Sequence, residues 1–236
     1  MSGAGRDAFE RAVAAYRVEG IDVPDEVASA AEASLAATGV LLAGEAHGVE
    51  QTPRAVYALA RRLGVDALGF EWSSDQFDQV VRPVLETGRI DREALWSLPP
   101  DAEAFCGDGR FTAGHVRLLE ELGDRLEELV CVDVLASETP QAREDEMATR
   151  VLATARPGRR LLVIVGSWHA GTEPDDGVEP AGHRIRRALP GLRTVMLAPA
   201  AGTAWFHGEH AHEPRPADLD VELPIGPAVP AVVPHM

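Results

Sequence analysis

The 236-residue sequence contains no lysine and no asparagine, so arginine supplies all 22 of its permanently cationic side chains. Without lysine, the chain has no amine for a Schiff base and no lysine for a phosphate-binding P-loop. Without asparagine, it has no acceptor for N-linked glycosylation. These two absences exclude whole classes of chemistry before any motif is considered.

Cysteine is also scarce, because Cys106 and Cys131 are the only two. Two thiols are too few for a disulfide framework or an all-thiolate zinc site. Cys131 lies within an apolar run and is predicted to be a small core residue. Cys106 stands beside Gly107 and is predicted to be a loop thiol.

Long apolar runs and an excess of positive charge are missing as well. No stretch of 18 apolar residues occurs and no export signal is recognisable, so we expect a cytoplasmic protein. The formal net charge of −16 disfavours nucleic acid and anionic membranes, which bind clustered cations. A small-molecule substrate is therefore the expected partner, and the oligomeric state stays open.

What the sequence does contain is an alternation of short apolar runs with helical periodicity. Strands are expected at 40–43, 66–70, 129–134, 161–165, 193–198 and 203–206. Helices are expected at 7–17, 25–37, 52–63, 74–87, 91–98, 112–129, 140–155 and 181–189. Such interleaving predicts one α/β domain over residues 1–236, with a mostly parallel central sheet and helices on both faces. Residues 213–236 are rich in proline and glycine and are expected to form an irregular tail.

Ionisable residues follow the expected strands at the point where each strand ends. Ending a buried strand in such a group costs free energy unless the group is paired. Because sites in open parallel sheets lie at the carboxyl edge, we expect one common site there. The residues concerned are Glu45 and His47 after the first strand, Glu71 after the second, Asp133 after the third and His169 after the fourth.

Four stretches resemble, in order and spacing, the erythromycin esterase / ChaN / Tiki / TraB-like superfamily. They are Gly44-Glu45-Ala46-His47-Gly48, Phe70-Glu71, Arg143-Glu144-Asp145-Glu146-Met147-Ala148 and Gly166-Ser167-Trp168-His169-Ala170. The resemblance covers about residues 38–170 and implies one pocket lined by Glu45, His47, Glu71, Arg143 and His169. Members include ester and lactone hydrolases, metal-dependent peptidases and haem-binding lipoproteins. This chain is considerably shorter than the erythromycin esterases, so a region sized for a macrolide is not expected.

A hydrolase reading follows from the chemistry of these side chains. His47 would act as the general base on water that attacks an ester, lactone or amide carbonyl, held by Glu45 or Glu71. Arg143 would stabilise the oxyanion, and His169 would protonate the leaving group. This reading needs no cofactor. Further substrate-binding residues are expected at Trp72, Trp168, His115 and Asp133.

Two alternatives use the same region of the chain. Two imidazoles and two carboxylates also suit Zn²⁺, Mn²⁺ or Fe²⁺, so a metal-dependent enzyme or metal-binding protein is the second hypothesis. A haem-binding protein is the third, with Tyr16 and Tyr57 as the available phenolates. The tract His207, His210 and His212 is expected to be a solvated loop, with a site rim or a metal binder as alternatives. Ser167 lacks a Gly-x-Ser-x-Gly context, which excludes a serine hydrolase.

Overall fold

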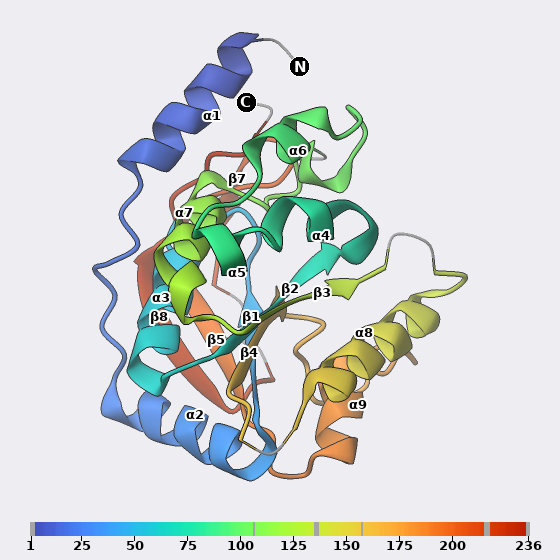
Figure 1. Cartoon of the computed structure of the whole chain (residues 1–236). Helices are drawn as coiled ribbons and strands as arrows, with labels where there is room; N and C mark the ends of the chain where they lie inside the picture. The colour runs from blue at the N-terminus through green and yellow to red at the C-terminus, as the bar shows by residue number, and fades with distance from the viewer. Residues whose placement is uncertain (1–2, 106, 135–136, 157, 215–217, 235–236) are drawn as a thin grey trace.

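The computed structural model describes residues 3–105, 107–134, 137–156, 158–214 and 218–234. Its centre is a six-stranded sheet in the order β3-β2-β4-β1-β5-β8 (Figure 1). Every strand pair in this sheet is parallel. The strands are β1 (Val40–Glu45), β2 (Ala67–Ser73), β3 (Glu128–Asp133), β4 (Leu161–Gly166), β5 (Thr194–Ala200) and β8 (Val221–Pro227). The expected α/β fold with a parallel central sheet is confirmed.

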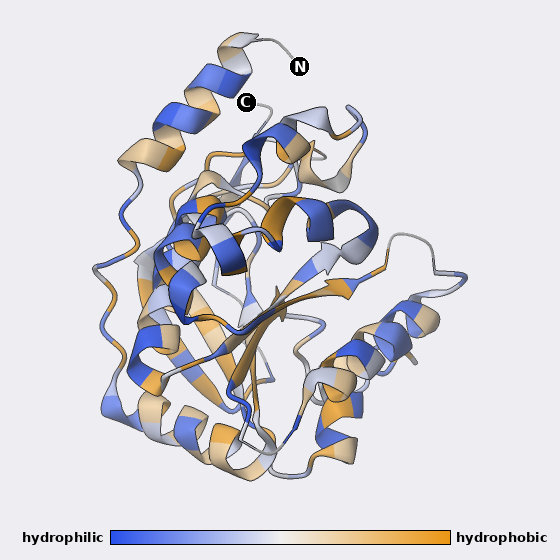
Figure 2. Cartoon of the chain, viewed as in Figure 1, coloured by the Kyte–Doolittle hydropathy of each residue, from blue (hydrophilic) through white to orange (hydrophobic). Residues whose placement is uncertain are grey.

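Helices cover both faces of the sheet, as parallel strands require. On one face, α8 (Pro140–Thr154) and α9 (Ala181–Ala188) pack Met147, Val151 and Ile185 against Val163 and Val165. The larger cluster on the other face includes residues of α1 (Gly3–Ala15), α2 (Asp25–Thr38), α3 (Thr52–Leu63), α4 (Ser74–Val81) and α7 (Ala113–Leu122). Apolar residues run along the strands between these layers, and polar ones lie on the outer faces of the helices (Figure 2).

Helix boundaries follow from local chemistry. Gly39, at φ 75°, ends α2, and its N–H donates to the Leu35 carbonyl before β1 begins. Pro53 stands in the first turn of α3, where its missing N–H costs no hydrogen bond. The hydroxyls of Thr112 and Thr139 cap α7 and α8 by accepting backbone N–H groups. These caps fix where each helix leaves the carboxyl edge of the sheet.

The expected irregular tail at 213–236 is wrong, because residues 221–227 form β8 and pair with β5. Leu223 and Ile225 are buried in alternation with exposed neighbours, which is the period of a half-buried strand. Pro224 is compatible with this strand because β8 lies at the edge of the sheet. In the sequence-based prediction, the proline and glycine content of this segment outweighed its alternation of apolar and polar residues.

Two long helices are also shorter than expected. The helix expected over 112–129 ends at Leu122 and continues as a 3₁₀ turn, η2 (Gly123–Arg125). Gly123 passes close to the carbonyl of Val84, where a Cβ would come within 2.8 Å. The helix expected over 74–87 divides at Pro83 into α4 and α5 (Val84–Thr87), because proline cannot donate within a helix.

The remaining elements complete the chain. They are α6 (Arg92–Ser97), the 3₁₀ turn η1 (Glu103–Phe105) and a hairpin of β6 (Gly202–Trp205) with β7 (Glu209–His212). The histidine tract thus contributes to a strand rather than forming a loop throughout. Cys131 is buried as expected, and Cys106 lies outside the described residues. None of the helices described here is long and apolar enough to cross a membrane.

Candidate active site

Side chains from neighbouring strands meet at the carboxyl edge of the sheet. Glu45 is the last residue of β1, Glu71 lies near the end of β2 and Asp133 is the last residue of β3. His47 and His169 follow β1 and β4 directly, and these two strands are paired in the sheet. Because the sheet order is β3-β2-β4-β1, residues far apart in the sequence come together at one edge.

The centre of the cluster is a carboxylate between two imidazoles. His47 Nε2 lies 3.6 Å from Glu71 Oε2, and His169 Nε2 lies 3.4 Å from Glu71 Oε1. Each ring is held at its other nitrogen by a second carboxylate. His47 Nδ1 lies 3.0 Å from Glu45 Oε1, and His169 Nδ1 lies 2.8 Å from Glu144 Oε1. Both imidazoles are thereby oriented with Nε2 toward Glu71.

Gly166 makes this arrangement sterically feasible. A Cβ at this position would lie 3.0 Å from His47 Nε2 and 3.3 Å from Glu71 Oε2. The backbone N–H of Gly166 also donates to Glu71 Oε2 at 2.6 Å. The glycine that opens the Gly166–Ala170 motif therefore leaves room for the imidazole and anchors the carboxylate.

Two arginines place positive charge beside the carboxylates of the cluster. Arg143, from the first turns of α8, binds Asp133 through Nε at 2.8 Å and through Nη2 at 2.5 Å. Arg143 Nη2 also donates to Glu71 Oε1 at 2.9 Å, and Nη1 lies 3.4 Å from His169 Nε2. Arg110 reaches the same carboxylates, at 2.9 Å from Asp133 Oδ2 and 3.3 Å from Glu71 Oε1. A chain of shared, charge-assisted hydrogen bonds results.

Sequence reasoning missed Arg110, Asp108 and Glu144. Arg110 follows the Gly107–Gly109 turn, and its Nε donates to Asp108 Oδ2 at 2.5 Å. Glu144 is buried beneath α9, where it accepts hydrogen bonds from His169 and from the Ala181 N–H. Glu144 stands within the Arg143–Ala148 motif, so its position next to Arg143 was the available signal. No spacing rule pointed to Arg110.

The charges of the cluster reinforce one another. Burial alone would lower the pKa of His169, but hydrogen bonds to Glu144 and Glu71 outweigh it and raise the pKa to about 9. Burial also opposes a charge on His47, yet the nearby Glu71 and Glu45 carboxylates raise its pKa above the ordinary value. The pKa of Glu71 is held well below its usual range because the positive charge of His47, His169 and Arg110 outweighs its burial.

The other residues expected to bind substrate lie in different surroundings. His115 is buried at the start of α7 with Nδ1 2.9 Å from the Thr112 hydroxyl, and burial together with nearby His47 lowers its pKa to about 3. Trp72 packs in the core, stacked on Phe70 with ring centroids 4.1 Å apart. It touches the cluster indirectly, because its Nε1 donates to the Arg110 carbonyl at 2.9 Å.

Trp168 differs from Trp72 because it is 39% exposed. Its ring lies edge-on to His169, with centroids 5.2 Å apart, and its Nε1 donates to Asp175 at 2.9 Å. Asp133, also expected to bind substrate, accepts hydrogen bonds from Arg143 and Arg110. Trp168 is thus the expected aromatic residue that is accessible beside an imidazole.

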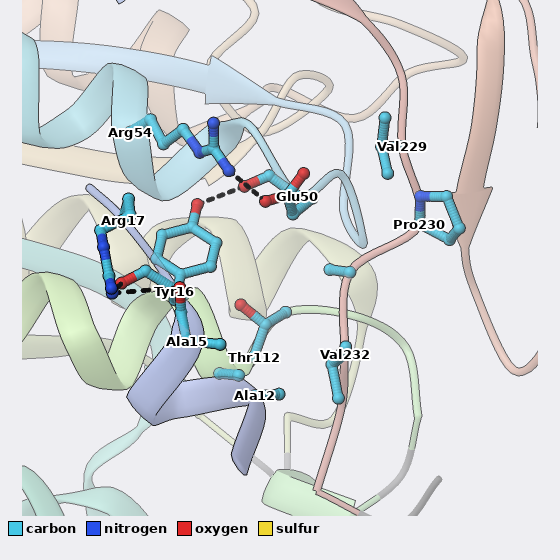
Figure 3. Close-up of a pocket in the computed structure, with 13 residues that line it drawn as sticks. Ala12, Ala15, Tyr16, Arg17, Glu50, Arg54, Thr112, Val229, Pro230 and Val232 are labelled. Carbon is cyan, nitrogen blue, oxygen red and sulfur yellow. Dashed lines mark hydrogen bonds and ion pairs between the residues drawn. The ribbon is translucent and has the colours of Figure 1, made fainter. Parts of the chain in front are cut away.

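A cavity of about 280 Å³ lies apart from this cluster, between the end of α1, the start of α7 and residues 229–232 (Figure 3). Two hydrogen bonds join polar groups of its lining: the Tyr16 hydroxyl donates to the Glu50 carbonyl, and Arg54 donates to the Glu50 carboxylate. Burial raises the pKa of Tyr16, which opposes the phenolate form that a haem ligand requires. The ionisable cluster, rather than this cavity, is therefore the candidate active site.

Comparison with known proteins establishes a likeness of fold. No protein-family model and no curated protein sequence matches the chain. Among solved structures, one described as "Bacterial protein toxins" is 19% identical with a TM-score of 0.53, over 90% of this chain and 42% of that one. A second, "Crystal structure of bacterial protein toxins", is 21% identical with a TM-score of 0.52, over 83% of this chain and 40% of that one.

A third structure is RRSP, a MARTX toxin effector domain from Vibrio vulnificus CMCP6. It is 17% identical with a TM-score of 0.49, over 92% of this chain and 41% of that one, which is too distant to carry an argument. The chain spans about two fifths of the length of each of these three structures. What these likenesses share with the present chain is the fold, and a fold alone does not determine an activity.

Proposed function

We propose that this chain is an acid–base hydrolase that cleaves an ester, lactone or amide of a small molecule. The observation that carries the proposal is the order carboxylate, imidazole, Glu71, imidazole, carboxylate at the carboxyl edge of the sheet. Titratable groups whose pKa values are shifted by specific charged partners within one cluster are typical of catalytic sites. The resemblance to the erythromycin esterase / ChaN / Tiki / TraB-like superfamily supports the same reaction class.

In the proposed reaction, the neutral His47 accepts a proton from the attacking water at Nε2. Glu45 holds the ring from Nδ1 and stabilises the imidazolium that forms. His169 is the general acid, because a pKa of about 9 keeps its ring protonated at neutral pH. It donates this proton to the leaving oxygen or nitrogen. Glu71 lies between the two Nε2 atoms and stabilises whichever ring is charged.

Arg143 is placed to bind the oxyanion. Its Nε and Nη2 are fixed by Asp133 and Glu71, which leaves Nη1, next to His169 Nε2, as the donor closest to the proposed acid. A guanidinium held in this way needs little rearrangement as charge develops on the substrate. In the proposal, Arg110 acts through Asp133 and Glu71 by holding both carboxylates in position. Its charge also helps to lower the pKa of Glu71.

We include no metal ion in the proposal, because the donor set does not fit one. Glu71 and Asp133 already accept hydrogen bonds from both guanidinium groups, and the Arg143 cation lies 3.4 Å from His169 Nε2. A divalent cation would have to displace these permanent charges. In the described part of the chain, no group of three or more His, Cys, Asp or Glu side chains is arranged to hold a metal.

The test is hydrolysis of p-nitrophenyl acetate and γ-butyrolactone by the wild-type chain and by His47→Ala. A well-placed general base contributes about 10²–10⁴-fold to rate, and the loss of kcat/KM should fall in that range. His183→Ala is the control, since His183 lies in α9 and hydrogen-bonds the Thr172 carbonyl outside the cluster. Equal activity of His47→Ala and wild type, with both folded by circular dichroism, would remove His47 from the reaction.

A further inference from the structure

The hairpin of β6 and β7 ends in a tight, well-defined tip. Trp205 pairs with Glu209, which leaves Phe206, His207 and Gly208 as the turn. His207 adopts φ 53°, a left-handed conformation that costs free energy in a residue other than glycine. The Phe206 N–H donates to the Gly208 carbonyl at 2.8 Å and closes the turn. The Phe206 ring lies beside the His207 ring, with centroids 4.8 Å apart.

This tip is attached to two of the loops that carry site residues. The Trp205 N–H donates to the Gly48 carbonyl at 3.0 Å, directly after His47. The His207 N–H donates to the Gly107 carbonyl at 2.6 Å, in the turn that leads to Arg110. The contact leaves no space at Gly48, where a Cβ would lie 1.7 Å from the Trp205 carbonyl oxygen. The hairpin is thus seated on the edge of the candidate site.

The residue presented at this tip is apolar and accessible, because Phe206 is 50% exposed. Among the described residues, the exposed large hydrophobic side chains are Phe206, Trp168 and Val229. Trp168 lies beside His169, on a loop that packs against α9 through the hydrogen bond from Gly182 N–H to the His169 carbonyl. Phe206 directly follows Trp205, whose backbone contacts the loop that carries His47. One accessible aromatic residue thus stands beside His169, and another stands on the hairpin that contacts the His47 loop.

We propose that Phe206 is a specificity-determining residue that contacts the acyl chain of the substrate, so the site favours an extended, uncharged acyl group over a short one. This inference rests on the proposed hydrolase function and names its substrate class. The chain's net charge of −16 disfavours an anionic group at this position. An aromatic side chain fixed on a rigid turn binds an apolar chain with little loss of conformational freedom.

The experiment compares Phe206→Ala with wild type in the full chain, and uses Val229→Ala as the control at another exposed apolar position. The substrates are p-nitrophenyl acetate, butyrate and hexanoate. Removing an apolar contact of this size should lower kcat/KM for the hexanoate about tenfold and change the value for the acetate less than twofold. Val229→Ala should leave the ratio of hexanoate to acetate unchanged.

Binding of 2-heptanone, measured by calorimetry, decides the inference without turnover. This ketone carries the pentyl chain and carbonyl of a hexanoyl group but no leaving group. Weaker binding to Phe206→Ala, with wild-type binding to Val229→Ala, supports the acyl contact. If wild type then cleaves no ester, the proposed hydrolase function is wrong but the contact of Phe206 with the acyl chain stands. Equal binding to Phe206→Ala and wild type, or no binding to either, overturns the role of Phe206 whatever the turnover measurements give.

Discussion

A cluster of arginine and carboxylate side chains lies at each end of the strands β2, β3 and β4. The two clusters differ in whether they contain imidazoles. At the amino edge, Arg159 binds Asp66 at 3.3 Å, Glu127 at 3.1 Å and Glu128 at 3.2 Å. At the carboxyl edge, arginines bind Glu71 and Asp133, and two imidazoles also contact Glu71. Only the second cluster contains groups that exchange protons near neutral pH.

The two clusters also differ in their exposure to solvent. The Glu127 side chain is 72% exposed, whereas that of Glu71 is 4% exposed. Water therefore screens the carboxylates at the amino edge, and the protein surrounds those at the carboxyl edge. Burying several ionised groups together costs free energy, because each group loses its hydration. An ion pair that only joins two strands can stay exposed and avoid this cost. We infer that the amino-edge cluster holds strands together and that the carboxyl-edge cluster supports chemistry.

The largest expected effect is the loss of turnover when an arginine of the carboxyl-edge cluster is replaced. Arg143→Leu should lower kcat for p-nitrophenyl acetate by about 10²–10³-fold, the usual cost of losing one donor to an oxyanion. Arg143→Lys should recover only part of the rate, because an ammonium cannot hold Asp133 and Glu71 with the same fork of donors. Rates equal to wild type in both variants would assign Arg143 a structural role like that of Arg159.

Arg159→Leu should give the opposite pattern. Its guanidinium is buried, and its removal should lower the free energy of unfolding by about 1–3 kcal/mol, measured by urea denaturation. The kcat per folded molecule should not change, because Arg159 lies at the far end of the strands. Arg156→Leu is the control, since the side chain of Arg156 is an exposed neighbour that binds Glu128 at 3.4 Å. A loss of kcat in Arg159→Leu would show that the two edges are coupled.

A subtler change concerns the pH profile. In wild type, activity should rise as His47 loses its proton, above its ordinary pKa of 6.5, and should fall near pH 9 as His169 loses its own. Glu144→Gln removes the negative charge that helps raise the pKa of His169, so the alkaline limb should move to lower pH. An alkaline limb that stays near pH 9 in Glu144→Gln would assign it to another group.

The smallest effect expected is that of metal removal. Incubation with EDTA, followed by gel filtration into metal-free buffer, should change kcat/KM less than twofold, because arginines already occupy the shared carboxylates. Zinc added to the treated protein should not raise the rate. A loss on chelation that zinc restores would favour the metal-dependent alternative and would require Arg143 and Arg110 to move aside.

Much of the site could be predicted from the sequence because its residues follow strands. Glu45, His47, Glu71 and His169 each stand at or just after an apolar run, and parallel strands bring such ends to one edge. Arg143 was expected from the family resemblance, and the structure brings it to the same carboxylates. The parallel sheet itself followed from the alternation of strands and helices.

What could not be predicted depends on contacts between segments distant in sequence. Arg110 follows a turn at Gly109, in a segment whose sequence shows no helical or strand periodicity. Its contact with Glu71 depends on the path of this loop in the folded chain. Glu144 is on a helix whose buried face is defined by α9, which comes much later in the chain. The strand β8 was missed because Pro224 and Gly226 are common in loops, and only pairing with β5 makes them acceptable at an edge.

The bare α-carbon of Gly166 makes the candidate site sensitive to a single methyl group. A side chain there would bring its Cβ to 3.0 Å from His47 Nε2 and 3.3 Å from Glu71 Oε2, so both groups would have to shift by a few tenths of an ångström. In the proposed reaction, such a shift would change the geometry across which protons move. Among homologous sequences, the residue in this place is therefore the one to compare with measured activity.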